Sequence, residues 1–329
     1  MNRFLKLAPL FIILSFITLS FADAQYAVSR AETAAAELLN NGRADDAIRL
    51  LKDLLKENPQ NADAYNLLSR VYYATEDWDS AIRNGERATE LQPNNSGFHL
   101  WLGRAYGSKA DDANGFSAMS LARKAVSEFQ RAVQLDSTNV RAMQDLAEFY
   151  VEAPGIVGGG KDKARALADR VAATYPTLSH WIRARILNKE KKLREAESEF
   201  KDSIAASGKT PATILELARF YKWTGRNDDV QTTVASALAA EKPRPIDLFT
   251  AAELLDGAGR NFPGAIQLLK TYLAGKMVED GPAFRAHYLI GEMYEKSGER
   301  NKAIAEYKAA LALASNYRLA KDGLRRLGL

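Results

Sequence analysis

The clearest chemical motif in the sequence is a glycine-rich stretch that ends in a lysine, Gly155 to Lys161. Its spacing, G-x4-G-K, is that of a loop that binds nucleotide phosphates. Such a loop also needs a Ser or Thr after the lysine, a strand before it and a helix after it. Here Asp162 follows, whose charge repels phosphate, and residues 143–150 have a helical pattern. We therefore predict a connector in which the glycines are free to adopt positive φ angles and Lys161 begins a helix.

The three histidines are the next candidates, because imidazole is a common metal ligand. His99, His180 and His287 lie far apart in the sequence, on separate helical segments, so they are not expected to converge on one ion. We expect them to pack between helices. No Ser-His-Asp set or close carboxylate pair has supporting context. The sequence therefore predicts no catalytic residue, no cofactor and no metal site.

Composition narrows the class of protein further. The chain has 329 residues, of which 47% are hydrophobic and 26% charged, as in an ordinary folded protein. A net charge of +4 is too small to indicate a nucleic-acid partner, and none is expected. There is no cysteine, which excludes a disulfide framework, a thiol nucleophile and a lipid attachment site. It also fits a compartment in which free thiols would oxidise.

Residues 1–24 have the pattern of an export signal. Arg3 and Lys6 precede a mostly apolar run, Leu7 to Phe21, and a small-x-small sequence ends at Ala24. We predict cleavage after Ala24, an exported and periplasmic protein, and no stable membrane insertion after cleavage. The alternative is an uncleaved anchor, although the apolar run is shorter than the ~20 residues of a membrane span.

The rest of the chain follows a 34-residue period, clearest over residues 62–95. Tyr65, Leu68 and Tyr72 share one helical face, and a second helical pattern ends before Pro93. Two helices this short cannot bury their apolar faces alone, so they need copies on both sides. We expect such units over residues 28–61, 62–95, 96–139, 140–176, 177–210, 211–242, 246–279 and 284–317, with additions at 107–124 and 153–160 and a capping helix over 318–329.

This pattern resembles the tetratricopeptide repeat family. The family signature is a Leu-Gly or Leu-Ala pair, then Tyr, then Ala, Phe or Tyr, Ala and Pro. Residues 284–317 match it with Ile290-Gly291, Tyr294 and Tyr307. The resemblance extends over about 290 residues. It implies an all-α fold, an α-solenoid of about eight helix-turn-helix units with a C-terminal capping helix, whose first helices line a concave groove.

By the same resemblance, positions 2, 5, 9, 12 and 13 of each unit face the groove. Many residues there are arginine or aromatic, the types that dominate binding hot spots, and arginine binds carboxylates through paired hydrogen bonds. The resulting candidates for ligand binding are Arg70, Tyr73, Arg104, Arg141, Gln144, Trp181, Arg185, Asn188, Arg219, Lys222, Trp223, Arg285 and Tyr288. We expect the partner to be an acidic protein or an extended, acidic peptide. Chaperone tails are not expected, because Glu32 and Ala36 occupy the positions where tail-binding members carry Lys and Asn.

We therefore predict a non-enzymatic scaffold or adaptor in the cell envelope that holds a protein or peptide on its concave face. Oligomeric state and partner identity stay open. One alternative is a carbohydrate or cell-wall binding module that uses Tyr73, Trp181 and Trp223, because aromatic faces also suit sugars. Others are a membrane-anchored assembly factor, if the signal is not cleaved, and a nucleotide-binding enzyme that uses Gly155 to Lys161. We also expect Arg185→Glu combined with Arg219→Glu to weaken partner binding without unfolding the array.

Overall fold

The structure is a computed structural model that describes residues 28–329, and throughout that range its regular elements are helices. The predicted signal over residues 1–24, with its cleavage site after Ala24, lies outside the described residues. No helix of the described range combines the length and hydropathy that a membrane crossing requires.

The helices come in successive hairpins joined by short turns. Residues 28–40 form the first helix, which pairs with α2 (Ala44–Glu57). The later pairs are α3 (Ala62–Ala74) with α4 (Trp78–Leu91), α5 (Ser96–Asp112) with α6 (Gly115–Leu135), α7 (Val140–Glu152) with α8 (Lys161–Val171), α9 (Pro176–Lys189) with α10 (Leu193–Ala206), α11 (Pro211–Trp223) with α12 (Asn227–Ala239), α13 (Pro245–Gly257) with α14 (Phe262–Ala274), and α15 (Ala283–Lys296) with α16 (Arg300–Leu313). A last helix, α17 (Arg318–Arg326), packs on α15 and α16. The predicted α-solenoid of about eight helix pairs with a capping helix is confirmed.

Small residues explain how closely the two helices of a pair approach. A Cβ added to Gly103 would lie 2.7 Å from the ring of Phe129, and one on Gly291 would lie equally close to Tyr307. Each glycine thus makes room on the first helix for an aromatic ring from the second. The same combination, a glycine on the first helix and an aromatic ring on the second, packs the third and the eighth pair.

The ends of the units are fixed by asparagine caps. Asn61 and Asn139 each accept a hydrogen bond from the backbone N–H three residues on, and Asn95 accepts from Gly97 and Phe98. These caps satisfy N–H groups that have no partner within the helix, and each contributes about 1 kcal/mol.

The third and fourth pairs depart from the common length. The third pair has helices of 17 and 21 residues, against 13 in both α3 and α7. The fourth pair is joined by a glycine-rich connector that contains a 3-10 turn, η1 (Gly155–Val157), with φ angles of +102° at Gly158 and +138° at Gly160. It runs from helix α7 into α8, which begins at Lys161. The segment thus lacks the preceding strand that a phosphate-binding loop requires.

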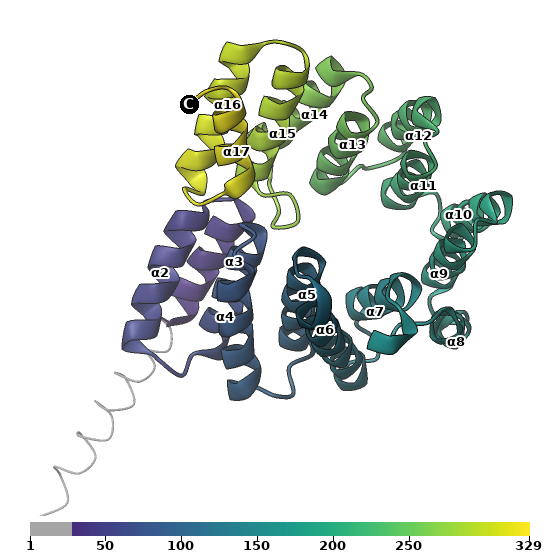
Figure 1. Cartoon of the computed structure of the whole chain (residues 1–329), viewed down its shortest axis with the longest axis horizontal. Coiled ribbons are helices and arrows are strands. Elements are labelled where there is room, and N and C mark those ends of the chain that lie inside the picture. Colours follow the sequence, from purple (N-terminus) through teal and green to yellow (C-terminus); the bar gives the residue numbers. More distant parts are fainter. Residues whose placement is uncertain (1–27) are drawn as a thin grey trace, which may run out of the picture.

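The pairs curve into a ring, so that the first and last pairs meet (Figure 1). Helices pack mainly against elements near them in sequence, and α2 additionally meets α16. At this seam Asp45 accepts a hydrogen bond from the backbone N–H of Ser315 at 2.9 Å, and Arg318 pairs with Glu76 at 3.2 Å. The two halves therefore touch at their ends around a shared opening.

Candidate functional site: the inner wall of the ring

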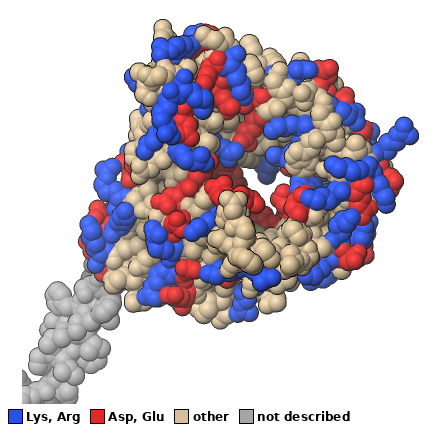
Figure 2. Space-filling view, in the orientation of Figure 1, with Lys and Arg blue, Asp and Glu red and all other residues tan. Residues whose placement is uncertain are grey.

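The inner wall of the ring is formed by the first helices of the pairs. Several successive first helices contact one another: α3 contacts α5, α7 contacts α9, and α13 contacts both α11 and α15. Figure 2 shows an opening through the ring whose border carries both acidic and basic side chains. The predicted groove residues lie on these same helices, so the wall is the surface on which to test them.

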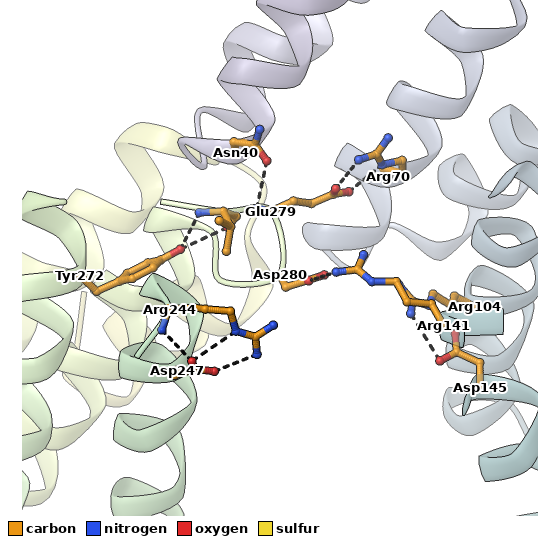
Figure 3. A network of polar contacts seen from close by, with 11 residues as sticks. Asn40, Arg70, Arg104, Arg141, Asp145, Arg244, Asp247, Tyr272, Glu279 and Asp280 are labelled. Carbon is orange, nitrogen blue, oxygen red and sulfur yellow. Dashed lines mark hydrogen bonds and ion pairs between the residues drawn. The ribbon is translucent and has the colours of Figure 1, made fainter. Parts of the chain in front are cut away.

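Two of the predicted arginines hold a loop of the chain itself. This loop, residues 275–282, joins α14 to α15. The Arg70 guanidinium binds the carboxylate of Glu279 through two nitrogens, with Nε to Oε1 at 2.8 Å. Arg141 on α7 pairs with Asp280 at 2.9 Å (Figure 3). A turn that carries two carboxylates thus lies against α3 and α7, where the sequence predicted an acidic ligand.

The loop is held in shape by Tyr272, which is fully buried. Its hydroxyl donates to the carbonyl of Gly281 at 2.6 Å and accepts from the N–H of Val278 at 2.8 Å. The N–H of Glu279 donates to Asn40 at the end of the first helix. Burial raises the pKa of the tyrosine hydroxyl, so it stays neutral at ordinary pH. The loop therefore reaches the arginines in a set conformation.

Arg104 and Tyr73 form a second cluster on the wall. Arg104 donates to Asp145 on α7 at 2.5 Å and lies over the ring of Trp101, with 4.6 Å from its guanidinium carbon to the ring centroid. Tyr73 packs with Trp101 and Trp78 at centroid distances of 5.6 and 5.4 Å. The Tyr73 ring is thus engaged by its neighbours, which leaves it little free face for a sugar.

Arg185 and Trp181 were expected to face a ligand, but both side chains are buried. Arg185 is 5% exposed, and its Nη2 donates to Glu148 at 2.9 Å and to Glu152 at 3.1 Å. Its guanidinium lies 4.2 Å from the ring centroid of Trp223. Arg185→Glu would therefore place an acid beside two carboxylates, so the expectation that this substitution spares the fold does not agree with the structure.

The later helices of the inner wall, α9 to α15, also pair these candidate side chains with carboxylates. The indole N–H of Trp181 donates to Glu216 at 3.0 Å, and Arg219 pairs with the same carboxylate at 3.3 Å. Arg285 pairs with Glu253 at 2.6 Å. All six candidate arginines therefore have a carboxylate partner within the chain, a feature that reasoning from groove positions alone missed.

The remaining candidates differ in how accessible they are. Gln144 and Asn188 are half-buried, and Lys222 is exposed and lies over Gly257 of α13. Trp223 is 43% exposed, and the guanidinium of Arg185 lies over its ring. Tyr288 stacks on Tyr307, and burial raises its pKa to about 12.

The three histidines share one arrangement. In each, Nδ1 faces a glutamate on the second helix of the same pair: His99 with Glu128, His180 with Glu199 and His287 with Glu306, at 2.5 to 2.8 Å. Asp202 lies near His180 and Glu199, so these three side chains offer ligand atoms within 4.8 Å of one another. Because the same histidine–glutamate pair recurs twice without a third carboxylate, pairing within the hairpin accounts for the arrangement.

The fold and its inner wall define a repeat solenoid. Tetratricopeptide repeat models match residues 38–84 and residues 284–317. The chain is 22% identical to Superkiller complex protein 3 of Mus musculus over an alignment of 291 residues. The alignment covers 87% of this chain and 18% of that protein. It is 29% identical over 192 residues to DnaJ homolog subfamily C member 3 of Gallus gallus. That alignment covers 58% of this chain and 33% of that protein. The chain thus spans a third or less of these relatives.

Two solved structures are similar to this chain. Yeast Tom70 aligns with a TM-score of 0.50 at 16% identity, over 86% of this chain and 59% of Tom70. A thermophilic TPR protein of Thermus thermophilus aligns with a TM-score of 0.47 at 20% identity, over 59% of this chain and 98% of that one. Residues 38–84 and 284–317 carry tetratricopeptide repeats. Proteins built from such repeats generally act as protein-binding scaffolds and are typically non-catalytic.

Proposed function

We propose that this protein is a non-enzymatic scaffold that binds an extended, acidic protein segment along the inner wall of its ring. The observation that carries the proposal is the position of the loop over residues 275–282. Glu279 and Asp280 of this loop already occupy Arg70 and Arg141. A partner segment with two neighbouring carboxylates would find the same two guanidinium groups at the same spacing, by exchange with the loop.

The energetics of the loop make such exchange feasible. Asp280 and Arg141 are both largely exposed, and exposed ion pairs contribute about 0–1 kcal/mol. The pair between Arg70 and Glu279 is better shielded and bidentate, so it is the stronger of the two. A partner that replaces both pairs and adds contacts to Trp223 gains free energy without requiring the helices to move.

The binding test uses a fluorescein-labelled peptide of twelve residues that contains neighbouring Glu and Asp residues, followed by anisotropy. The variant Glu279→Gln/Asp280→Asn frees both arginines, so we expect it to bind more tightly than the wild type. The variant Arg70→Gln/Arg141→Gln is expected to lose about tenfold or more in affinity, because it removes both charge-assisted contacts.

A matched control replaces two exposed arginines on second helices, Arg83→Gln/Arg194→Gln, and changes the net charge equally. Its affinity should stay close to that of the wild type. If the control loses as much affinity as Arg70→Gln/Arg141→Gln, binding is non-specific and the proposal is wrong. Thermal unfolding of each variant distinguishes a lost contact from a lost fold.

We place this scaffold in the cell envelope because of the export pattern in residues 1–24. Mass spectrometry of the protein from its host should find an amino terminus at Gln25. An intact Met1 terminus in the membrane fraction would support the anchored assembly factor instead. A carbohydrate-binding function has less support, because Trp181 is buried and Tyr73 is packed against two tryptophans.

A further inference from the structure

A pocket of about 840 Å³ lies between the lengthened third pair and the glycine-rich connector. Its floor is apolar and includes Met119 and Ala122 of α6, Phe149 of α7, and Val157 of η1. Both additions to the repeat pattern contribute to it, since residues 107–124 supply one wall and residues 153–157 the other. Such a volume admits a few side chains and excludes a folded domain.

The connector is fixed in place, so the pocket is preformed. Arg123 of α6 donates to the carbonyl of Ile156 at 3.2 Å. Gly158 lies against Val126, and a Cβ on Gly159 would be 1.9 Å from the carbonyl oxygen of Ala153, so the turn requires glycine. A ligand therefore meets a wall that needs no ordering on binding.

The rim of the pocket is acidic. Asp111, Asp145, Glu148 and Glu152 line it, against one guanidinium, that of Arg104. Arg104 is bound to Asp145. Among residues 28–329, Asp111 forms no ion pair. Its side chain is exposed, and partial desolvation together with the charge of its neighbour Asp112 raises its pKa.

The second poorly compensated carboxylate is Glu148. It shares the single Nη2 of Arg185 with Glu152, while Lys189 pairs only with Glu152. Half of the Glu148 side chain is exposed, but the protein around the rest of it disfavours the charged form and raises its pKa despite the nearby guanidinium. The rim thus has two carboxylates, Asp111 and Glu148, whose negative charge would be stabilised by a cation from a ligand.

Two apolar side chains on the additions are largely exposed. Phe116 at the start of α6 is 90% exposed, and Ile156 of η1 is 67% exposed. Ile156 lines the pocket, and Phe116 borders the adjoining hollow that shares Met119 with it. Exposed apolar groups beside an apolar pocket are typical of a docking surface.

We propose that this pocket binds a protein segment in which bulky apolar residues are flanked by Lys or Arg. The apolar residues contact Met119, Phe149 and Ile156, while the cations approach Asp111 and Glu148. Charge complementarity selects this occupant, because the rim repels nucleic acid and anionic lipid surfaces. The proposal does not depend on the acidic-ligand site, since its decisive residues and its charge are different.

The probe is a labelled twelve-residue peptide that contains two Phe, two Leu and four Lys, compared with the same peptide carrying Glu at each Lys. We expect saturable binding of the lysine peptide only. The chain as a whole carries a net charge of +4, so general electrostatics would favour the glutamate peptide. Preference for lysine would therefore report a local acidic site.

Two variants test the two parts of the pocket. Asp111→Asn/Glu148→Gln removes the rim charge, and Phe116→Ser/Ile156→Ser removes the exposed apolar groups without touching the core. Each should weaken binding of the lysine peptide by about tenfold. The control, Glu37→Gln/Glu241→Gln, removes two exposed carboxylates on other elements and should have no effect.

Three results would overturn the proposal: no saturable binding of the lysine peptide, equal binding of the glutamate peptide, or equal losses in the control. The Arg70→Gln/Arg141→Gln variant should bind the lysine peptide normally. Loss of acidic-peptide binding in that variant, with lysine-peptide binding intact, separates the two sites from each other.

Discussion

Gly42, in the turn of the first pair, lies against Ala283, the first residue of α15. A Cβ on Gly42 would be 2.2 Å from the backbone nitrogen of Ala283, and the φ angle of Gly42 is +66°. The two residues are adjacent only because the ring closes, so the two backbones approach closely at this point of the seam. Closure is thus built into the backbone in addition to the ion pairs that span it.

The first prediction is that Gly42→Ala opens or loosens the seam. The added methyl cannot fit beside Ala283, and the positive φ costs about 1 kcal/mol for a residue with a side chain. We expect a lower midpoint of thermal unfolding and a larger radius of gyration by small-angle X-ray scattering. Gly298→Ala is the control, because Gly298 has a φ of +77° with no neighbour within 4 Å. If the two substitutions have equal effects, the loss of stability comes from backbone strain alone, and the contact between Gly42 and Ala283 does not hold the ring closed.

The second prediction concerns the loop over residues 275–282. Tyr272→Phe removes the hydroxyl that bonds Val278 and Gly281, which leaves two buried backbone groups unsatisfied at a cost of about 1–3 kcal/mol. Hydrogen exchange of the amides of Val278 and Glu279 should become faster. Tyr65→Phe, which removes an exposed hydroxyl, should leave this exchange unchanged. Unchanged exchange in Tyr272→Phe would mean that the arginines alone hold the loop.

The third prediction is that Arg185 is structural. Arg185→Met leaves Glu148 and Glu152 without their shared guanidinium, so we expect a loss of about 2 kcal/mol of unfolding free energy at pH 7. The loss should shrink in acid, because protonation removes the repulsion between the two carboxylates. Arg194→Met, at an exposed position, should be near neutral by denaturant unfolding. If the Arg185→Met variant is as stable as the wild type but binds ligand more weakly, Arg185 contributes to ligand binding and the prediction is wrong.

The fourth prediction is a pH dependence from Glu197 on α10. Lys201, Arg226 and the hydroxyl of Tyr221 outweigh the effect of burial and lower its pKa to about 2, from 4.5. Since the ionised form is favoured in the folded state, the stabilisation is fully present above pH 4.5 and is lost as the pH falls toward 2. Glu197→Gln should therefore be less stable than the wild type at pH 7, by about 1 kcal/mol.

Measured by urea unfolding, this difference between Glu197→Gln and the wild type should disappear near pH 2. Glu195→Gln, an exposed neighbour on the same helix, serves as the control and should show no such dependence. A constant difference across the range would indicate that Glu197 acts through packing and not through its charge.

The sequence predicts the helix pairs well, because their causes are local. Gly103 and Gly291 leave space for one aromatic ring each, and Asn61 and Asn139 cap the helices at the expected period. These signals act within a unit or between neighbours, so a single sequence reveals them. The same holds for the connector, in which Gly158 and Gly160 take positive φ angles as expected.

The ring and the pairing of the arginines were not predictable in this way. Arg70 meets Glu279 only through the summed rotation of all the pairs between them, and no single pair determines that sum. Trp181 and Trp223 were both assigned to the groove, yet one is buried because Arg185 and Glu216 cover it. A scan for carboxylates about one repeat from each arginine would have found Asp145 and Glu253. The exposed Phe116 and Ile156 lie in the two additions, whose role the pattern left open.

The seam also changes how the ends of this chain behave. In an open array each terminal repeat has one neighbour, so the two ends fray independently. Here Asp45 and Glu76 of the first two pairs are bound to Ser315 and Arg318 beside the last one. Unfolding of either the first or the last helix pairs therefore removes contacts from the other, so the local stabilities of these two regions are coupled.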